Sequence, residues 1–177
     1  MLKDEHDFRI SLAGAQEKTA LLRQDGKWYL PQQATPTTHI IKREMGEIRS
    51  HDRGIDMTHS VENEFLCLHI ARAYGFDVPD CEIIAPNGVK ALAVERFDRK
   101  LSKDGSWIVR LPQEDFCQVT GMSPAKKYGS DSGPGIHRIM KELLGSQQPL
   151  EDRETFMRAQ VLFWLLGWAC KKLFRVY

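Results

Sequence analysis

Residues that could bind an anionic ligand lie in three places within the first hundred positions of this chain. The first is residues 11–18, which read SLAGAQEK and place small side chains between two expected strands. Small side chains let the main-chain amides of a turn approach an anion closely, as in loops that hold phosphates. A tight hairpin without a ligand needs the same composition, and one glycine without a Walker pattern favours that simpler interpretation.

The second place is Lys42, which ends an apolar segment, residues 38–42, with the pattern of a strand. A strand lysine that contacts phosphate oxygens and is held by a helix glutamate is a recurring part of phosphoryl-transfer sites. Glu62 and Glu64 follow in an expected helix and are candidates for that glutamate. Considered alone, a lysine at a strand end is more often an ordinary surface residue.

The third place is residues 95–98, which read ERFD and follow an expected strand. A main-chain segment between two lobes can offer a carbonyl and an amide to an adenine edge, while an aromatic side chain such as Phe97 closes the pocket. A strand end capped by charges is the alternative. The order along the chain, with a small-residue loop, a strand lysine, a helix glutamate and a hinge, is nevertheless that of a kinase amino-terminal lobe.

The elements that must position these residues are a small sheet and then helices. Hairpin signals at Asp25-Gly26 and Asn87-Gly88 indicate antiparallel pairing of the strands that flank them. Alternation and β-branched content predict strands at residues 8–12, 19–22, 28–30, 38–42, 81–85 and 89–96. A helix is expected to begin at Ser60 and to end before Gly75, and the polar residues 51–58 are expected to form a loop.

After Asp98 the pattern becomes mainly helical. It predicts one strand at residues 107–111 and helices at residues 114–119, 136–144 and from 151 onward. This order predicts an α+β protein with two lobes joined near residues 96–100. We expect residues 1–98 to form a nucleotide-binding lobe and residues 99–177 to form part of a helical lobe.

The composition is that of a globular protein. Of 177 residues, 42% are hydrophobic and 28% are charged, and the net charge of +1 argues against non-specific binding to nucleic acid. The charged amino-terminal residues and the lack of a long apolar run predict a cytoplasmic protein without a membrane segment. The four cysteines form no C-x-x-C pair near histidines, so we expect no metal site.

Several segments resemble the HipA family of serine/threonine kinases, the toxins of bacterial toxin–antitoxin pairs. They are FRISLAGAQEKTALL (residues 8–22), TPTTHIIK (35–42), ALAVERFDR (91–99) and RLPQED (110–115). The resemblance extends over nearly all of residues 8–167. It implies a protein-kinase-like fold that is incomplete in this chain, with an antiparallel nucleotide lobe containing one helix and the first helices of the helical lobe.

The resemblance implies ATP and Mg²⁺ as cofactors and Ser11 as an autophosphorylation site that switches the family's enzymes off by displacing the phosphate loop. The implied ATP-binding residues are Ala13, Gly14, Ala15, Gln16, Glu17, Lys18, Lys42, Glu95, Arg96 and Phe97. The implied substrate is glutamyl-tRNA synthetase. The implied partner is HipB, a helix-turn-helix antitoxin, so that contact with DNA is only indirect and no membrane is involved.

After Gly167 the sequence departs from the family pattern. The family continues with ATDGHAKNFSV, which supplies the catalytic Asp and Asn, whereas residues 168–177 read WACKKLFRVY and place Cys170 at the position of that Asp. Codons for DGHAKNFSVY, when read two bases late, encode WACKKLFRV, as expected for a small deletion with a frameshift. The gene's nucleotide sequence tests this hypothesis.

We therefore expect a family member that is truncated at both ends, with an aberrant tail after Gly167, no catalytic Asp or Asn, no metal ligands and no activity by itself. The family's extra amino-terminal subdomain, before the phosphate loop, would be missing here, either lost or made elsewhere. One alternative is an active toxin kinase that a second chain completes. Another is a non-catalytic decoy that binds the antitoxin or a nucleotide.

Overall fold

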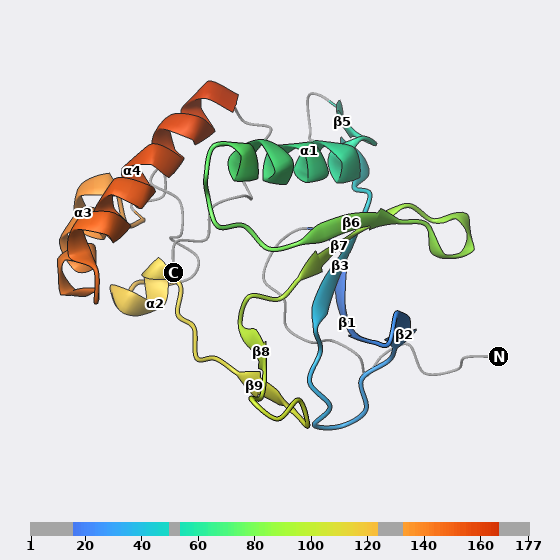
Figure 1. Cartoon of the computed structure of the whole chain (residues 1–177). Helices are drawn as coiled ribbons and strands as arrows, with labels where there is room; N and C mark the ends of the chain where they lie inside the picture. The colour runs from blue at the N-terminus through green and yellow to red at the C-terminus, as the bar shows by residue number, and fades with distance from the viewer. Residues whose placement is uncertain (1–15, 50–53, 124–132, 167–177) are drawn as a thin grey trace. The chain divides into compact units, whose positions relative to one another are not determined.

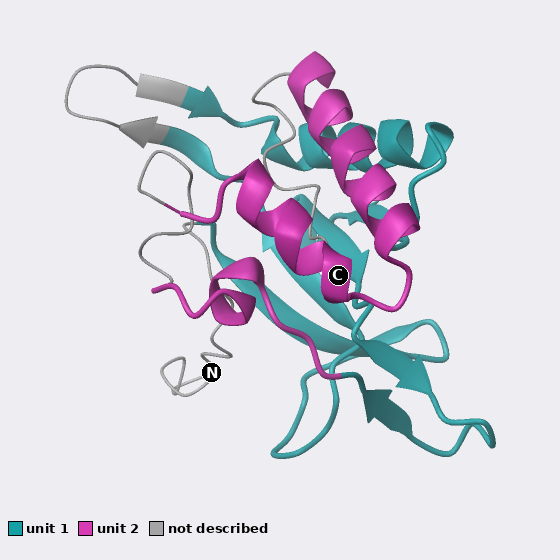
Figure 2. Cartoon of the chain, turned by 90° about the vertical axis from the view of Figure 1, so that its left-hand side faces the viewer, with its two compact units in different colours: residues 1–111 teal, residues 112–177 magenta. Residues whose placement is uncertain are grey.

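The computed structural model of the protein describes residues 16–49, 54–123 and 133–166 (Figure 1). The chain forms two compact units, Met1–Leu111 and Pro112–Tyr177, which Figure 2 shows in different colours. The units are defined by packing, so the functional division expected at residue 98 stays a prediction. Strands dominate the first unit and helices the second, which confirms the α+β class.

The first unit is built on a five-stranded antiparallel sheet. Its strands lie in the order β2-β1-β3-β7-β6. Their bounds are Lys18–Gln24 (β1), Lys27–Tyr29 (β2), His39–Arg43 (β3), Cys81–Ile84 (β6) and Ala91–Glu95 (β7). The expected strands that fall among the described residues of this sheet are confirmed, whereas residues 8–12 lie outside the described residues.

Both predicted hairpin turns are present. Asp25 and Gly26, with φ of 49° and 74°, join β1 to β2. Two successive residues with positive φ are what a two-residue type I′ hairpin requires, and an Asp-Gly pair accommodates them. Asn87 and Gly88, with φ of 53° and 79°, turn the chain between β6 and β7.

Helix α1 (Ser60–Ala73) packs against β6 and β7 on one face of the sheet (Figure 1). Val61 of α1 and Leu92 of β7 are the largest fully buried side chains. Burying each contributes about 1.5–3 kcal/mol. The helix ends before Gly75, whose φ of 81° suits a glycine, as the sequence predicts.

The other face of the sheet has its own apolar cluster. Ile41, Ala91 and Ala93 are buried there, with Leu21 and Trp28 packed against them. Because side chains alternate along a strand, burying Ile41 on this face directs its neighbour Lys42 to the face that α1 covers. The register agrees, since Lys42 lies opposite the buried Leu92.

Two small hairpins also belong to the described part of the first unit. Strand β4 (Gly46–Arg49) pairs with β5 (Gly54–Met57), and β8 (Arg99–Leu101) pairs with β9 (Ile108–Arg110). The expectation of a loop throughout residues 51–58 is therefore wrong for β5, and β8 was not predicted either. Both hairpins are held by main-chain pairing between nearby residues, which polar side chains do not signal.

The second unit contains helices α2 (Phe116–Val119), α3 (Ile136–Glu142) and α4 (Pro149–Leu166), so the expected helices are confirmed. A capping box between Asp115 and Gln118 begins α2. The Phe116 and Phe156 rings lie 6.4 Å apart and join α2 to α4.

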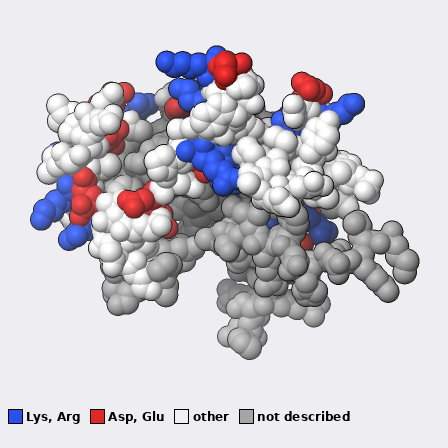
Figure 3. Space-filling view, turned by 90° about the horizontal axis from the view of Figure 1, so that it is seen from below, with Lys and Arg blue, Asp and Glu red and all other residues white. Residues whose placement is uncertain are grey.

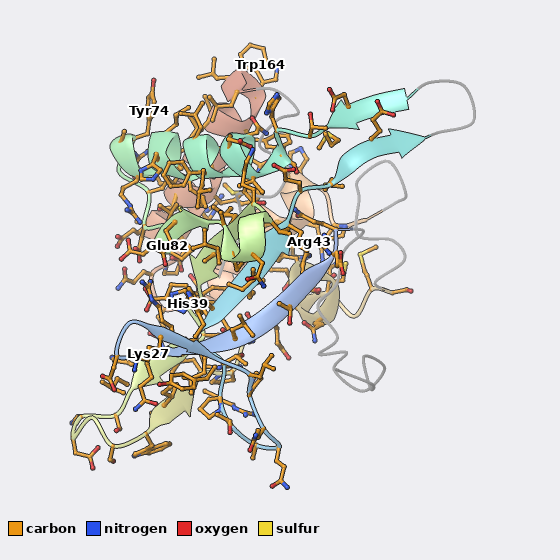
Figure 4. All side chains as sticks on the ribbon, turned by 90° about the vertical axis from the view of Figure 1, so that its right-hand side faces the viewer. Lys27, His39, Arg43, Tyr74, Glu82 and Trp164 are labelled. Atoms are coloured by element: carbon orange, nitrogen blue, oxygen red, sulfur yellow. The ribbon has the colours of Figure 1, made fainter. Side chains whose placement is uncertain are left out.

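Helix α4 also carries large apolar side chains on its surface, among them Trp164, which is 77% exposed (Figure 4). Within the described residues no helix is both long and apolar enough to cross a membrane. On the face in Figure 3, Lys and Arg side chains are interspersed with Asp and Glu, as the small net charge leads one to expect.

Candidate functional site

Lys42 of β3 and Glu64 of α1 form a shielded ion pair. Their side chains are only 15% and 10% exposed, so solvent ions screen the pair weakly. The pair exists because β3 directs Lys42 toward α1 and because Glu64 lies on the buried side of that helix. A helix glutamate therefore does hold Lys42, although whether Lys42 binds ATP stays a prediction.

Glu62, the other candidate, has a different partner. It accepts a hydrogen bond from Lys90, whose Nζ also lies 2.8 Å from Glu44. The hydrogen bond from Lys90 holds the pKa of Glu62 below its usual value, and the bonds to Glu44 and Glu62 raise the pKa of Lys90. We call the following group the lysine end of the sheet: Lys42, Glu64, Lys90, Glu44 and Glu62.

The exit of the small-residue segment is anchored beside Lys42. The Gln16 side chain is buried, and its Nε2 donates a 2.7 Å hydrogen bond to the main-chain oxygen of Arg43. Glu17 forms a 3.1 Å ion pair with Arg43, and Lys18 lies opposite Lys42 across β1 and β3. Gln16 therefore anchors the segment to β3 through its side chain.

Four predicted site residues lie outside the described residues, namely Ser11, Ala13, Gly14 and Ala15. Cys170, which the sequence analysis places at the position of the family's catalytic Asp, lies outside them as well. Their predicted roles stay predictions.

The predicted hinge, residues 95–97, lies at the end of β7 and is followed by a buried charge cluster. Arg96 donates from Nε and Nη2 to the two Asp98 carboxylate oxygens, at 2.9 and 2.7 Å. Arg99 Nη1 donates to Asp98 Oδ2 at 2.7 Å. We call Arg96, Asp98 and Arg99 the hinge cluster; their side chains are 9%, 7% and 12% exposed.

The two arginines keep Asp98 ionised. Burial alone would raise the pKa of Asp98, but the hydrogen bond from Arg96 and the charges of Arg96 and Arg99 outweigh it and hold that pKa below its usual value. Burial and the charge of Arg96 lower the pKa of Arg99, which as an arginine remains a cation. The cluster is thus a buried carboxylate between two guanidinium groups.

Hydrogen bonds within the protein limit which main-chain groups of the hinge can bind a nucleotide. The Arg96 amide donates to the Thr38 oxygen at 2.8 Å, and its Nη1 donates to Thr37 at 3.1 Å. The side chain and amide of Arg96 are therefore engaged within the protein, and its carbonyl oxygen accepts from the Arg99 amide at 3.2 Å. The amide of Glu95 is likewise bonded, to the Asp80 oxygen at 2.8 Å.

The sequence pattern places Asp98 in the hinge segment, residues 95–98, but does not predict that Asp98 pairs with Arg96 and Arg99. The available signal was the run of opposite charges Arg96, Asp98 and Arg99, which is compact enough for one turn to bring together. It also missed Lys90, for which no local pattern exists.

The hinge and Lys42 lie on one strand pair. Glu95 pairs with His39, and Lys42 lies three positions further along β3. At the rise of an extended strand the separation is about 10 Å. Figure 4 shows His39 and Arg43 at the two ends of this strand. One nucleoside phosphate could therefore contact both regions.

No group of three or more His, Cys, Asp or Glu side chains that could hold a metal ion occurs within the described ranges.

Comparisons with known proteins show which family the chain is similar to. The model of the HipA-like C-terminal domain matches residues 10–169. Y4mE of Sinorhizobium fredii, whose name describes it as a candidate kinase, is 39% identical over 134 residues. The match covers 76% of this chain and 30% of Y4mE. The serine/threonine-protein kinase toxin HipA of Shewanella oneidensis is 33% identical over 127 residues, which is 72% of this chain and 27% of that protein.

Among solved structures, HipA in the complex of HipA, HipB and operator DNA from Shewanella oneidensis MR-1 matches with a TM-score of 0.70 and 26% identity. The match covers 91% of this chain and 38% of that one. The chain thus spans about a third of the length of these relatives. Since the domain model matches most of the sequence, the resemblance is confirmed, and the chain belongs to the HipA-like C-terminal domain family.

Proposed function

We propose that this chain carries the nucleotide-binding part of a HipA-like serine/threonine kinase. The observation that carries the proposal is the shielded pair of Lys42 and Glu64 beside the anchored exit of the small-residue segment. In kinases a strand lysine held by a helix glutamate contacts the nucleotide phosphates. Kinase relatives that use ATP support the same assignment.

Each part of the site has a defined task in this proposal. Lys42 and the main-chain amides of residues 13–18 hold the phosphates, while Glu95 and Phe97 hold adenine. The Lys42 ammonium has three donors, so it can keep its bond to Glu64 and also donate to a phosphate oxygen. Mg²⁺ is the metal that the resemblance implies, and no step of the proposal uses it.

Calorimetric titration with ATP tests the proposal. The matched variants are Lys42→Ala and Lys27→Ala, the latter on the exposed strand β2. Losing a charge-assisted hydrogen bond of about 1.5–3 kcal/mol predicts that Lys42→Ala weakens binding roughly 10- to 150-fold. Lys27→Ala should bind as the wild type does. Tight binding that survives Lys42→Ala would place the nucleotide elsewhere.

We also propose that the 177-residue chain does not transfer phosphate by itself. Cys170 stands where the resemblance places the Asp that accepts the hydroxyl proton, and a thiol is a poor substitute for that carboxylate. With radiolabelled ATP and purified glutamyl-tRNA synthetase, the proposed substrate, we expect incorporation no higher than with Lys42→Ala. Labelling of Ser11 or of the synthetase above that control would refute this part. The alternative of an active kinase completed by a second chain predicts labelling once that chain is added.

A HipB-like helix-turn-helix antitoxin is the proposed partner. The support is the solved complex, in which the matching chain is crystallised with HipB and operator DNA. The net charge of +1 fits a protein that reaches DNA only through such a partner. Co-purification of this chain with a HipB-like antitoxin tests the proposal, and failure to retain the antitoxin at micromolar concentrations would contradict it. Retention without kinase activity would favour the decoy alternative.

A further inference from the structure

The Asp98 side chain is held more completely than the position of a surface turn requires. Asp98 is 5% exposed, and guanidinium groups occupy both carboxylate oxygens. Two parallel bonds from Arg96 give the fork geometry that fixes both partners in orientation as well as in distance.

The main chain of Asp98 is also a junction. Its carbonyl oxygen accepts from the Leu111 amide at 3.0 Å and from Arg99 Nη1 at 2.8 Å. The Arg99 amide donates to the Arg96 oxygen at 3.2 Å and closes a turn. One residue therefore joins the end of the hinge, the start of β8 and the residue that follows β9.

Arg96 is also hydrogen-bonded to the residues that precede β3, the strand that carries Lys42. Its amide donates to the Thr38 oxygen, and its Nη1 donates to the hydroxyl of the buried Thr37, two residues before β3. The conformation of residues 95–97 is thus fixed at one end by β3 and at the other by Asp98. Asp98 is not itself placed to read a base, because both of its oxygens are engaged by arginines.

We propose that Asp98 is a positioning residue that sets the main chain of residues 95–97 for adenine, and thereby the adenine part of the nucleotide affinity. This inference rests on the proposed nucleotide site. Its physical basis is preorganisation: a segment already held in its binding conformation loses little freedom when the ligand arrives. Without the Asp98 carboxylate, Arg96 loses its bidentate acceptor and the hinge becomes free to rearrange.

The test uses two ligands that divide the site. ATP contacts both the hinge and Lys42, whereas inorganic tripolyphosphate contacts only Lys42 and the residues near it. Calorimetry on Asp98→Asn should show ATP affinity reduced about tenfold by the loss of preorganisation and tripolyphosphate affinity changed less than about twofold. The matched control is Asp104→Asn, in the exposed β8–β9 turn, which should leave both affinities unchanged.

A second variant covers the case in which Asp98→Asn folds poorly. Arg96→Lys keeps the positive charge but loses the fork, and it should show the same selective loss of ATP affinity. Thermal melts on every variant report the folded fraction, to which affinities are normalised.

The possible outcomes distinguish the inference about Asp98 from the proposed nucleotide-binding function. Selective loss of ATP affinity supports the inference. Equal loss for both ligands assigns Asp98 a merely structural role and overturns it, as does an unchanged ATP affinity. A wild-type chain that binds neither ligand refutes the proposed function itself, and the inference fails with it.

Discussion

The two charged regions of the first unit are built in opposite ways. The hinge cluster joins residues within one turn of chain, at 12% exposure or less. The lysine end joins residues 22, 28 and 46 positions apart, and its outer part, around Lys90, is 35–41% exposed. The first is a compact local structure, whereas the second exists only after the sheet and α1 have come together.

This difference predicts that the two regions contribute differently to stability and to ligand binding. A buried carboxylate between two cations is costly to disrupt, since an uncompensated charge remains inside the protein. Partly exposed pairs between distant elements contribute little stability but report how those elements are placed. We therefore expect substitutions in the hinge cluster to have the largest effect on stability. Substitutions at the lysine end should change ligand binding more than they change stability.

The largest effect is expected for Asp98→Ala. It leaves two buried guanidinium groups without their shared carboxylate, which should lower the free energy of unfolding by about 3–5 kcal/mol. Urea denaturation measures this change. Asp104→Ala, in an exposed turn, should lower the free energy of unfolding far less. Similar losses for the two variants would remove the distinction between buried and exposed acids.

Lys42→Met comes next. The pair with Glu64 is shielded but not fully buried, so its loss should lower the free energy of unfolding by about 1–3 kcal/mol. Replacing both partners, as in Lys42→Met with Glu64→Leu, should recover part of this loss because no unpaired charge remains. Denaturation of the single and double variants gives the coupling free energy. A coupling near zero would mean that the two side chains do not interact.

Lys90→Met should have a smaller effect than Lys42→Met, because more than a third of each side chain that Lys90 joins is exposed. The loss should shrink further at high salt, where exposed charges are screened. Denaturation at low and high salt checks this. A salt-independent loss as large as that of Lys42→Met would make the lysine end as rigid as the hinge cluster.

The pH dependence of stability sharpens the comparison, because the contribution of ionised Asp98 is constant near neutrality and changes only in acid. The pKa of Asp98 is depressed in the folded chain, so the stability it contributes is present above its ordinary pKa of about 4 and is lost as the pH falls through the folded pKa. Wild-type stability should therefore decrease more steeply below about pH 4 than that of Asp98→Asn. Parallel acid denaturation curves would show that Asp98 is not held in its charged form.

Local patterns in the sequence predicted much of this fold. Asp25 and Gly26 marked a hairpin, and Ser60 and Gly75 bounded α1, because turn chemistry and helix ends act over a few residues. Strand β5 escaped prediction because its pairing is a main-chain property of a polar segment.

The candidate site was predictable in part. Lys42 and the hinge were identified from local sequence and from the resemblance. The choice of Glu64 over Glu62 was not, since residues two apart on a helix point in different directions and only the docking of α1 decides which one meets β3. The contact of Lys90 with Glu44 likewise depends on the folded sheet.

The central claim is that one nucleotide contacts both the hinge, residues 95–97, and Lys42. Hydrogen exchange, followed by mass spectrometry with and without ATP, tests it most directly. We predict slower exchange in peptides that contain residues 39–45 and in those that contain residues 94–100, with no change at residues 54–57. At an ATP concentration that just saturates the wild type, Lys42→Ala should show much weaker protection in both regions. Protection of only one region, or none at saturating ATP, would contradict the account.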